Sequence, residues 1–407
     1  MPADTVRARV NPLVLRWARQ SMNYRIEDIS RSTGVPPDVV EQWEHGDEMP
    51  TFRQLRLLAN KVKRPLAALF LPEPPQEPPL PRDFRRLPGP DLGRFQPDTI
   101  LAIRKARRIM EQASELAEAL NEELPDPIPS VSLRDSVEQI AYEARLDLGV
   151  SVEEQMEWPS ERKALQYWRD ALSRKGVLAL QVSMPREDAR GFSLTGRRFS
   201  VIAVTSREEE PYVSRIFSLF HEYAHLCLRR PGVSNRGELE EEEGHGPRAR
   251  VEAYCNRFAA AFLVPSADRA VADKLKTTSL LCRNALKVGQ EDQCDRAIRE
   301  TAHWFRVSKD VLLLRLKELG LLNPRLYEAV RTRWDEEYHR RARKKSGGPR
   351  RPDVTCLTER GRHFVSMVLA ALDSGYLTMG DARDYLSVPA HYLGSVRERL
   401  ASHGSYE

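Results

Sequence analysis

Residues 221–225 of the chain read His-Glu-Tyr-Ala-His. On an α-helix, side chains four positions apart lie on one face, so His221 and His225 would aim two imidazoles at the same point. Glu222 follows the first histidine and would reach a water molecule held there. Two nitrogen ligands and a carboxylate at this spacing are what zinc-dependent peptide hydrolysis requires. The pentapeptide therefore predicts a metal site in which Glu222 takes a proton from the attacking water.

The alternative for this pentapeptide is a surface helix with two solvated histidines. The flanking residues argue against it, because they are strongly apolar and indicate a buried helix. They are Ile216, Phe217, Leu219, Phe220, Ala224, Leu226 and Leu228. Three ionisable groups on a buried helix need a compensating partner, and a metal ion is the simplest one.

A catalytic zinc site keeps three protein ligands and one open position, so a third ligand is expected downstream. Residues 251–265 read as a second amphipathic helix that ends at Pro265, and Glu252 lies on it, 27 positions after His225. His245 is the competing candidate. It lies among glycines and glutamates that indicate a solvated loop, which gives no reason for a fixed geometry. We therefore rank Glu252 above His245.

These two segments resemble the ImmA/IrrE family of metallopeptidases. The family pairs the His-Glu-x-x-His helix, here within 217–230, with a Glu-x-x-x-Asn-x-Phe-Ala pattern. That pattern is matched here by Glu252, Asn256, Phe258 and Ala259. Residues 191–206 resemble the strands before the family's catalytic helix, and residues 302–321 resemble the helical unit after it. The resemblance spans roughly 130–325, with its motifs in the expected order.

The resemblance implies that His221, His225 and Glu252 bind the metal and that Glu222 is the general base. Zn²⁺ is the expected ion, and Mn²⁺ would tolerate the same ligands less selectively. The implied substrate is one specific protein, such as a small helix-turn-helix repressor whose cleavage changes transcription in stress or mobile-element control. For the group that stabilises the oxyanion, His245, Tyr212 and Tyr254 stay open as alternatives.

The first seventy residues resemble a different family. Residues 15–71 are similar to the Cro/C1-type helix-turn-helix domain of the XRE family. The matching residues are Leu15, Ile29, Gly34, Val35, Val40, Trp43, Glu44, Gly46, Pro50, Leu55, Leu58 and Ala59. In such a domain the helix over 37–45 would enter the major groove. Gln42 could then read an adenine, and Arg31 and Arg53 are further candidate contacts to double-stranded DNA.

The charge of this head does not by itself favour DNA. The outward residues of the 37–45 helix include the carboxylates Asp38 and Glu41 beside Gln42 and His45. Residues 13–71 carry nine basic and seven acidic side chains, which is no basic footprint. Operator binding and a role in protein interaction or dimerisation, including a homodimer, both stay open.

Prolines divide the chain. Eight prolines fall between Pro72 and Pro90, a density that forms an extended linker rather than a helix or central strand. We expect a helix-turn-helix domain at 1–72, a linker at 73–98 and a helical region with the peptidase domain at 99–330. A basic linker at 331–352 and a small helical domain at 353–407, turning at Gly375, would follow. For the basic linker, solvated chain is favoured over a nucleic-acid patch.

The fold class expected is α+β and mostly helical, with an all-α head and a zincin-like core around a small sheet. Residues 176–183, 191–196 and 198–206 read as its strands, because they are rich in β-branched and aromatic residues and are bounded by glycines. We expect 198–206 to offer its edge to an extended substrate by β-addition.

Composition favours a cytoplasmic setting without a membrane. The net charge of +5 is slight for 407 residues and decides nothing about nucleic acid. The first residues contain no apolar signal region, and no stretch reaches the length of a membrane span. The five cysteines form no Cys-x-x-Cys pair, and their odd number argues against a disulfide framework.

The sequence thus predicts a cytoplasmic zinc endopeptidase behind a Cro/C1-like head. The competing class is a DNA-binding regulator, or an antitoxin-like partner protein, with a structural or latent metal site. Glu222 discriminates between them, because a structural site needs ligands but no base and closes with four protein ligands.

Overall fold

The computed structural model describes residues 6–80, 82–83, 95–123, 125–185, 187–229, 232–234, 246–324, 327–328, 330–331 and 351–402. The chain forms two compact units. One comprises residues 1–80 and 87–103, and the other comprises residues 81–86 and 104–407. Within the described ranges, none of the helices combines the length and the apolar character that a membrane crossing requires.

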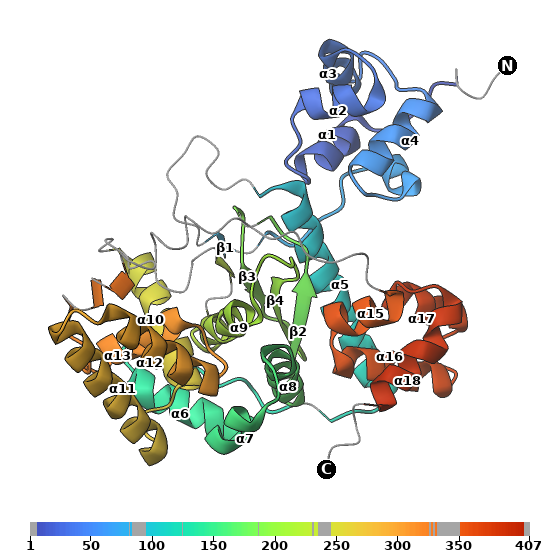
Figure 1. The fold of residues 1–407 in the computed structure, drawn as a ribbon. Coiled ribbons are helices and arrows are strands. Elements are labelled where there is room, and N and C mark those ends of the chain that lie inside the picture. Colours follow the sequence, from blue (N-terminus) through green and yellow to red (C-terminus); the bar gives the residue numbers. More distant parts are fainter. Residues whose placement is uncertain are drawn as a thin grey trace. The chain divides into compact units, whose positions relative to one another are not determined.

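The first unit is built on a bundle of short helices (blue in Figure 1). They are α1 (Pro12–Gln20), α2 (Ile26–Thr33), α3 (Pro37–His45), α4 (Phe52–Lys61) and the 3₁₀ turn η2 (Leu66–Phe70). Gly34 and Gly46 end α2 and α3 with φ of 73° and 91°, a left-handed conformation that side chains disfavour. Trp43 is 1% exposed at the centre of the bundle. The all-α head expected from the sequence is confirmed.

The second unit contains a five-stranded mixed sheet in the order β1-β5-β3-β4-β2. Its strands are β1 (Arg82–Asp83), β2 (Val177–Val182), β3 (Gly191–Leu194), β4 (Ser200–Thr205) and β5 (Gly232–Ser234). β2 pairs parallel with β4, with Val177 opposite Ser200. β3 pairs antiparallel with both β4 and β5. The α+β class is confirmed.

β4 lies inside the sheet. It is hydrogen-bonded to β3 on one side and β2 on the other, and all six of its residues are buried. The expectation that 198–206 offers a free edge to a substrate is therefore wrong. The continuous apolar run of this strand is typical of a central strand covered on both faces, whereas edge strands carry the unpaired backbone groups that β-addition uses.

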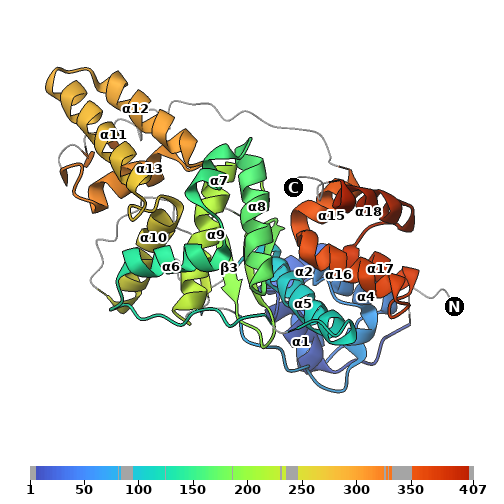
Figure 2. The ribbon, with the colours of Figure 1, turned by 90° about the horizontal axis from the view of Figure 1, so that it is seen from below.

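Helices pack on the sheet and on one another. α8 (Glu161–Arg174) lies against β2, and α9 (Tyr212–Cys227) lies against β3 and β4 (Figure 1). α8 and α9 run side by side in Figure 2 as well. α5 (Pro97–Ala119) runs from the first unit into the second. The remaining helices around this core are α6 (Val137–Leu148), α7 (Val152–Glu157), α10 (Pro247–Leu263), α11 (Arg269–Lys287), α12 (Glu291–Trp304) and α13 (Lys309–Glu318).

An aromatic cluster fixes α8, α9 and α10 against one another. The ring of Trp168 meets Phe220 edge-on at 4.8 Å and Phe262 at 5.3 Å, and Phe220 stacks on Phe262 at 4.0 Å between ring centroids. All three side chains are fully buried. Because aromatic rings bury large areas with defined geometry, this contact sets the distance between the two helices α9 and α10.

Buried polar side chains hold the carboxyl end of α10. Arg145 donates to the carbonyl of Phe262 at 3.0 Å, and Gln155 donates to that of Leu263 at 3.2 Å. Arg315 donates to Val264 at 2.9 Å. The last carbonyls of a helix have no partner within it, so these donors replace water at a buried helix end. They come from α6, α7 and α13, which explains how α10 is anchored.

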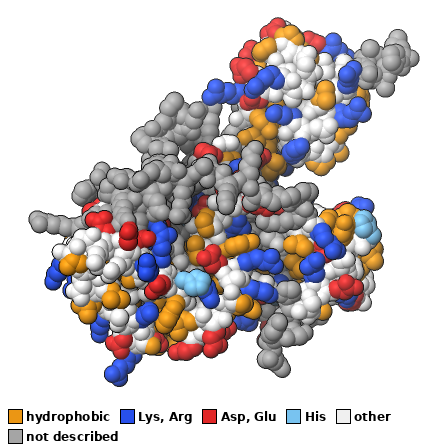
Figure 3. Space-filling model, viewed as in Figure 1, with side chains coloured by type: hydrophobic (Ala, Val, Ile, Leu, Met, Phe, Trp, Pro, Cys, Tyr) orange, Lys and Arg blue, Asp and Glu red, His pale blue; other side chains and the backbone are white. Residues whose placement is uncertain are grey.

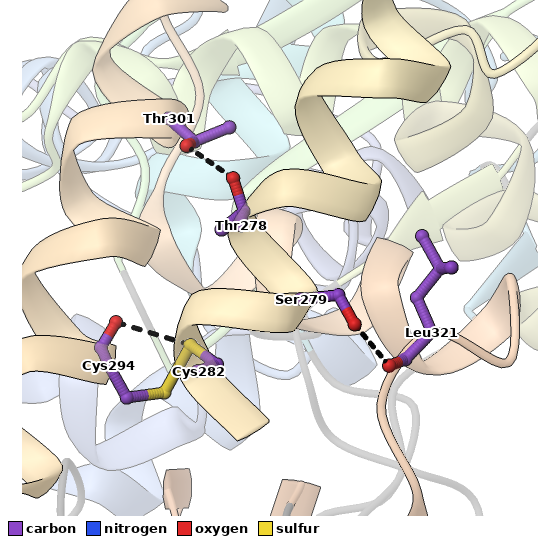
Figure 4. Close-up of a disulfide and its surroundings, with 6 residues drawn as sticks. All are labelled: Thr278, Ser279, Cys282, Cys294, Thr301 and Leu321. Carbon is purple, nitrogen blue, oxygen red and sulfur yellow. Dashed lines mark hydrogen bonds between the residues drawn. A yellow bond between two sulfur atoms is a disulfide. The ribbon is translucent and has the colours of Figure 1, made fainter. Parts of the chain in front are cut away.

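α11 and α12 form a hairpin closed by a disulfide between Cys282 and Cys294 (Figure 4). Both cysteines are fully buried. Thr278 and Thr301 share a hydrogen bond of 2.8 Å between the same helices. The odd number of cysteines had argued against disulfides, and that inference does not hold for this pair. A count says nothing about which side chains a helical hairpin brings together.

Replacing both Cys282 and Cys294 by serine should lower the free energy of unfolding by about 2–4 kcal/mol, because the bond removes entropy from the unfolded chain. Urea unfolding of the oxidised wild type and of the double variant measures the difference. The matched control is the same comparison with a reductant present, where the difference should shrink to the cost of burying two serine hydroxyls. A difference unchanged by the reductant would contradict an intact bond.

The C-terminal helices belong to the second unit. They are α15 (Pro352–Arg360), α16 (Arg362–Asp373), α17 (Met379–Leu386), the 3₁₀ turn η3 (Ala390–Tyr392) and α18 (Leu393–Ala401). α15 packs on β2, where Gln181 donates to the carbonyl of Thr358 at 3.1 Å. Gly361 separates α15 from α16 and has a φ of 82°, a left-handed conformation that residues with a side chain rarely adopt.

Candidate metal centre

The His-Glu-x-x-His segment lies on α9, which is buried along most of its length, as the sequence predicts. Pro211 precedes the helix in an extended conformation, and Arg215 in its first turns donates to the side chain of Gln181 on β2 at 2.9 Å. This bond helps to fix α9 against the sheet. His221, Glu222 and His225 are 4%, 1% and 0% exposed.

Glu252 on α10 faces the two histidines. Its carboxylate oxygens lie 3.4 Å from Nε2 of His221 and 3.2 Å from Nε2 of His225. The two Nε2 atoms are 3.2 Å apart. Within the described residues, these three side chains form the group of His, Cys, Asp and Glu whose ligand atoms converge as a metal ion requires.

The spacing of these atoms fits a tetrahedral ion. Ligand atoms bound at about 2.0–2.1 Å in tetrahedral geometry lie about 3.3 Å from one another. The three separations here are 3.2–3.4 Å. Two imidazole nitrogens and one carboxylate are also the donor set of catalytic zinc sites. The residues present therefore fit the metal that the sequence implied.

Electrostatics couple these three groups. Burial acts to raise the pKa of Glu252, but the hydrogen bonds and charges of His221 and His225 bring that pKa well below its ordinary value. Burial acts to lower the pKa of His225, but Cys255 and Glu252 raise it by more. The carboxylate is thus held ionised beside the two rings in the metal-free protein, and a bound metal ion would need His225 in its neutral form and would displace its proton.

Asn256 orients the first histidine. Nδ1 of His221 donates to the side-chain oxygen of Asn256 at 2.8 Å. A proton held on Nδ1 leaves the lone pair of Nε2 directed at Glu252 and His225. Asn256 was quoted only as part of the family pattern. Its role becomes visible because Asn256 lies one turn after Glu252 on α10 and so shares its face.

Asn256→Leu should weaken metal binding about 10–100-fold, because partners of a ligating histidine fix its tautomer and direction. Competition with a zinc-specific dye measures the affinity. Asn256→Asp is the matched control, since it keeps an oxygen acceptor and should bind more tightly than the leucine variant. Equal affinities for wild type and Asn256→Leu would leave this side chain with a packing role alone.

Glu222 points from α9 to strand β3. Ser193 donates its hydroxyl to the carboxylate of Glu222 at 2.9 Å, and burial raises the pKa of Glu222. A Cβ at Gly191 would lie 3.2 Å from Cγ of Glu222, so the glycine leaves room for this side chain. Ser193 was missed from the sequence, where nothing in a strand 29 residues earlier marks it as a partner.

Two of the candidates for stabilising the oxyanion, Tyr212 and Tyr254, lie among the described residues. Neither of them lies close to the metal ligands. Tyr212 begins α9, and nine helical residues before His221 correspond to about 13 Å along the axis. Tyr254 follows Glu252 by two positions, which turns it to the opposite side of α10, and it lines a different cavity beside Val131. His245 lies outside the described residues.

The candidate DNA contacts of the head are mostly exposed. Arg31 and Arg53 are exposed and Gln42 is half-buried. Glu44, which the sequence counted among the acidic charges, is buried and accepts two hydrogen bonds from Arg19 at 2.7 and 2.8 Å. This pair supports the fold of the bundle and presents no charge to a ligand.

A small sheet, a buried His-Glu-x-x-His helix and a carboxylate on the next helix make up this candidate metal centre. Comparison with protein families agrees: residues 172–317 match the peptidase family described as the IrrE N-terminal-like domain, and residues 15–69 match a helix-turn-helix domain. The chain thus contains an IrrE N-terminal-like domain behind a helix-turn-helix domain, and the resemblance seen in the sequence is confirmed. No curated protein and no solved structure matches the chain.

Proposed function

We propose that the protein is a zinc-dependent endopeptidase that cleaves a specific regulatory protein. The observation that carries this proposal is the convergence of His221, His225 and Glu252 at tetrahedral ligand spacing. These three residues would hold the ion. When bound, a zinc ion polarises a substrate carbonyl and lowers the pKa of a coordinated water toward neutrality.

Glu222 is the proposed general base. Its carboxylate is next to the ligands in sequence and accepts a hydrogen bond from Ser193, which fixes its direction. It takes a proton from the attacking water and returns it to the leaving amine. In the metal-free protein, burial raises the pKa of Glu222.

The substrate proposed from the family resemblance is a helix-turn-helix repressor whose removal changes transcription in stress or mobile-element control. The peptidase-family domain supports a protein substrate, and the head offers a surface for recruitment. One experiment tests whether the protein cleaves such a substrate. The zinc-loaded wild type and the metal-free protein are incubated with a bacterial lysate, and new protein termini are mapped by mass spectrometry. Termini made only by the loaded protein would support the proposal and identify the substrate.

The second candidate is a regulator that acts through the head, with a metal site that is structural or latent. The helix-turn-helix match favours it. Stoichiometric zinc without any new termini in the lysate experiment would support this reading. Against it, Glu222 lies within hydrogen-bond distance of Ser193, and three ligands converge among the described residues, where a closed structural site uses four.

The head is further proposed to bind double-stranded DNA through α3. Binding should weaken steeply as salt rises, because contacts to phosphates release counterions. Fluorescence anisotropy with duplexes from 50 to 200 mM salt measures it, and Gln42→Ala should relax base preference while Arg31→Ala and Arg53→Ala weaken all sequences alike. A salt-insensitive signal, or equal affinity for every duplex, would reduce the head to a protein-interaction module.

A further inference from the structure

A second cavity, of about 130 Å³, lies where the C-terminal helices meet the sheet and α8. The core contributes Arg162, Arg169 and Asp170 to its lining, and the C-terminal helices contribute Arg362 and Arg399. In the space-filling view, Lys and Arg side chains gather on the surface in this region (Figure 3). The cavity is remote from the metal centre, because its residues on α9 are limited to Tyr212 in the first turn.

Arg169 is the central group of this cavity. It is 7% exposed, and its Nε donates to the carbonyl of Ala179 at 2.7 Å. Its Nη2 atom is buried and finds no hydrogen-bond partner in the part of the chain that the structure describes. Burial lowers the pKa of this arginine to about 10. A buried cation with an unused donor is costly unless a further acceptor completes its hydrogen bonds, and an anion does so while also balancing the charge.

The backbone beside Arg169 leaves its guanidinium room. A Cβ at Gly361 would lie 3.3 Å from Nη2 of Arg169, and this glycine has a positive φ. Glycine at this turn thus keeps the space next to the guanidinium free of a side chain. The turn joins α15 to α16, so both the core helix and the C-terminal helices shape the same small space.

The charges around the cavity are unbalanced. Among the residues that the structure describes, its lining contains four arginines and a single carboxylate, Asp170. Arg362 lies 3.9 Å from Asp170, and Arg399 is occupied by Asp353 at 2.5 Å. When Asp170 and Asp353 are set against the four arginines, two positive charges stay in excess. Leu165, Val354 and Leu357 add an apolar wall to the same cavity.

We propose that this cavity binds the phosphate group of a small organic phosphate monoester, with its organic part against the leucines. Guanidinium groups match phosphate oxygens in paired hydrogen bonds, which is why arginine clusters select this group. A ligand held by Arg169 and Arg362 together connects the C-terminal helices to the core. Anything that binds the folded protein in this way also raises its stability.

The test uses the full chain with phenyl phosphate and inorganic phosphate as probes, in titration calorimetry and thermal unfolding. We expect saturable binding of both, tighter for phenyl phosphate because its ring is buried on the apolar wall. Arg169→Gln should weaken the binding of phenyl phosphate at least about tenfold, as loss of a charged hydrogen bond does. Neither calorimetry nor thermal unfolding depends on hydrolysis, so the result is independent of the proposed peptidase activity.

Arg169 also donates a hydrogen bond to the carbonyl of Ala179, so its replacement removes a structural contact as well as a ligand contact. A second variant therefore tests binding without that structural contact. Arg162 and Arg174 are both exposed on α8, and only Arg162 lines the cavity. Arg162→Gln should weaken phenyl phosphate binding, and the matched control Arg174→Gln should bind like the wild type. Absence of saturable binding to the wild type, or equal losses in Arg162→Gln and Arg174→Gln, would overturn the proposal.

Discussion

Glu222→Gln should slow peptide hydrolysis by about 10²–10⁴-fold and leave metal binding intact. The amide keeps the size of the carboxylate and can still contact Ser193, but it cannot take a proton from water. Hydrolysis is followed with the substrate identified by terminus mapping, and bound zinc is counted by elemental mass spectrometry. Because the side chain is 1% exposed and the replacement is isosteric, the fold should persist.

Ser193→Ala is the matched control for this variant. It removes the hydrogen bond to Glu222 and leaves the carboxylate itself, so its loss of rate should be much smaller than that of Glu222→Gln. Loss of zinc from Glu222→Gln would contradict the assignment, since Glu222 would then be a ligand. Full activity of the Glu222→Gln variant would show that another residue is the general base.

Glu252→Ala should reduce the affinity for zinc by more than 100-fold, beyond the ~10–100-fold that outer partners contribute. The alanine removes one of three ligands and leaves two buried imidazoles without the carboxylate that faces them at 3.2–3.4 Å. Equilibrium dialysis of zinc gives the affinity, and circular dichroism of the metal-free protein checks that the helices form.

An exposed glutamate supplies the control for that variant. Glu300→Ala, on the surface of α12, should bind zinc like the wild type. If Glu252→Ala kept the wild-type affinity while remaining folded, the third ligand would be another residue, and His245 would become the first candidate. If both variants lost zinc equally, the measurement would report general damage to the fold.

Local periodicity explains what the sequence could determine about the site. His221 and His225 share a helical face because of their spacing alone, and the apolar flanks place that face in the interior. Glu252 could be ranked above His245 by the same logic, because one lies in an amphipathic helix and the other among glycines. The strands at 177–182, 191–194 and 200–205 also follow from short-range composition.

Other features depend on which elements pack together, and only the tertiary structure decided them. β4 is an inner strand because β3 and β2 both pair with it, and its own residues cannot reveal the neighbours. Ser193 reaches Glu222 across the contact of β3 with α9, and Cys282 meets Cys294 across a helical hairpin. Arg169 and Arg362 come from segments almost two hundred residues apart and line one cavity.

The sequence by itself determined which ionisable side chains share one helix face, because that depends only on their spacing along the chain. The tertiary structure decided which side chains from other segments contact them. Those contacts depend on side-chain volume and burial summed over the whole core.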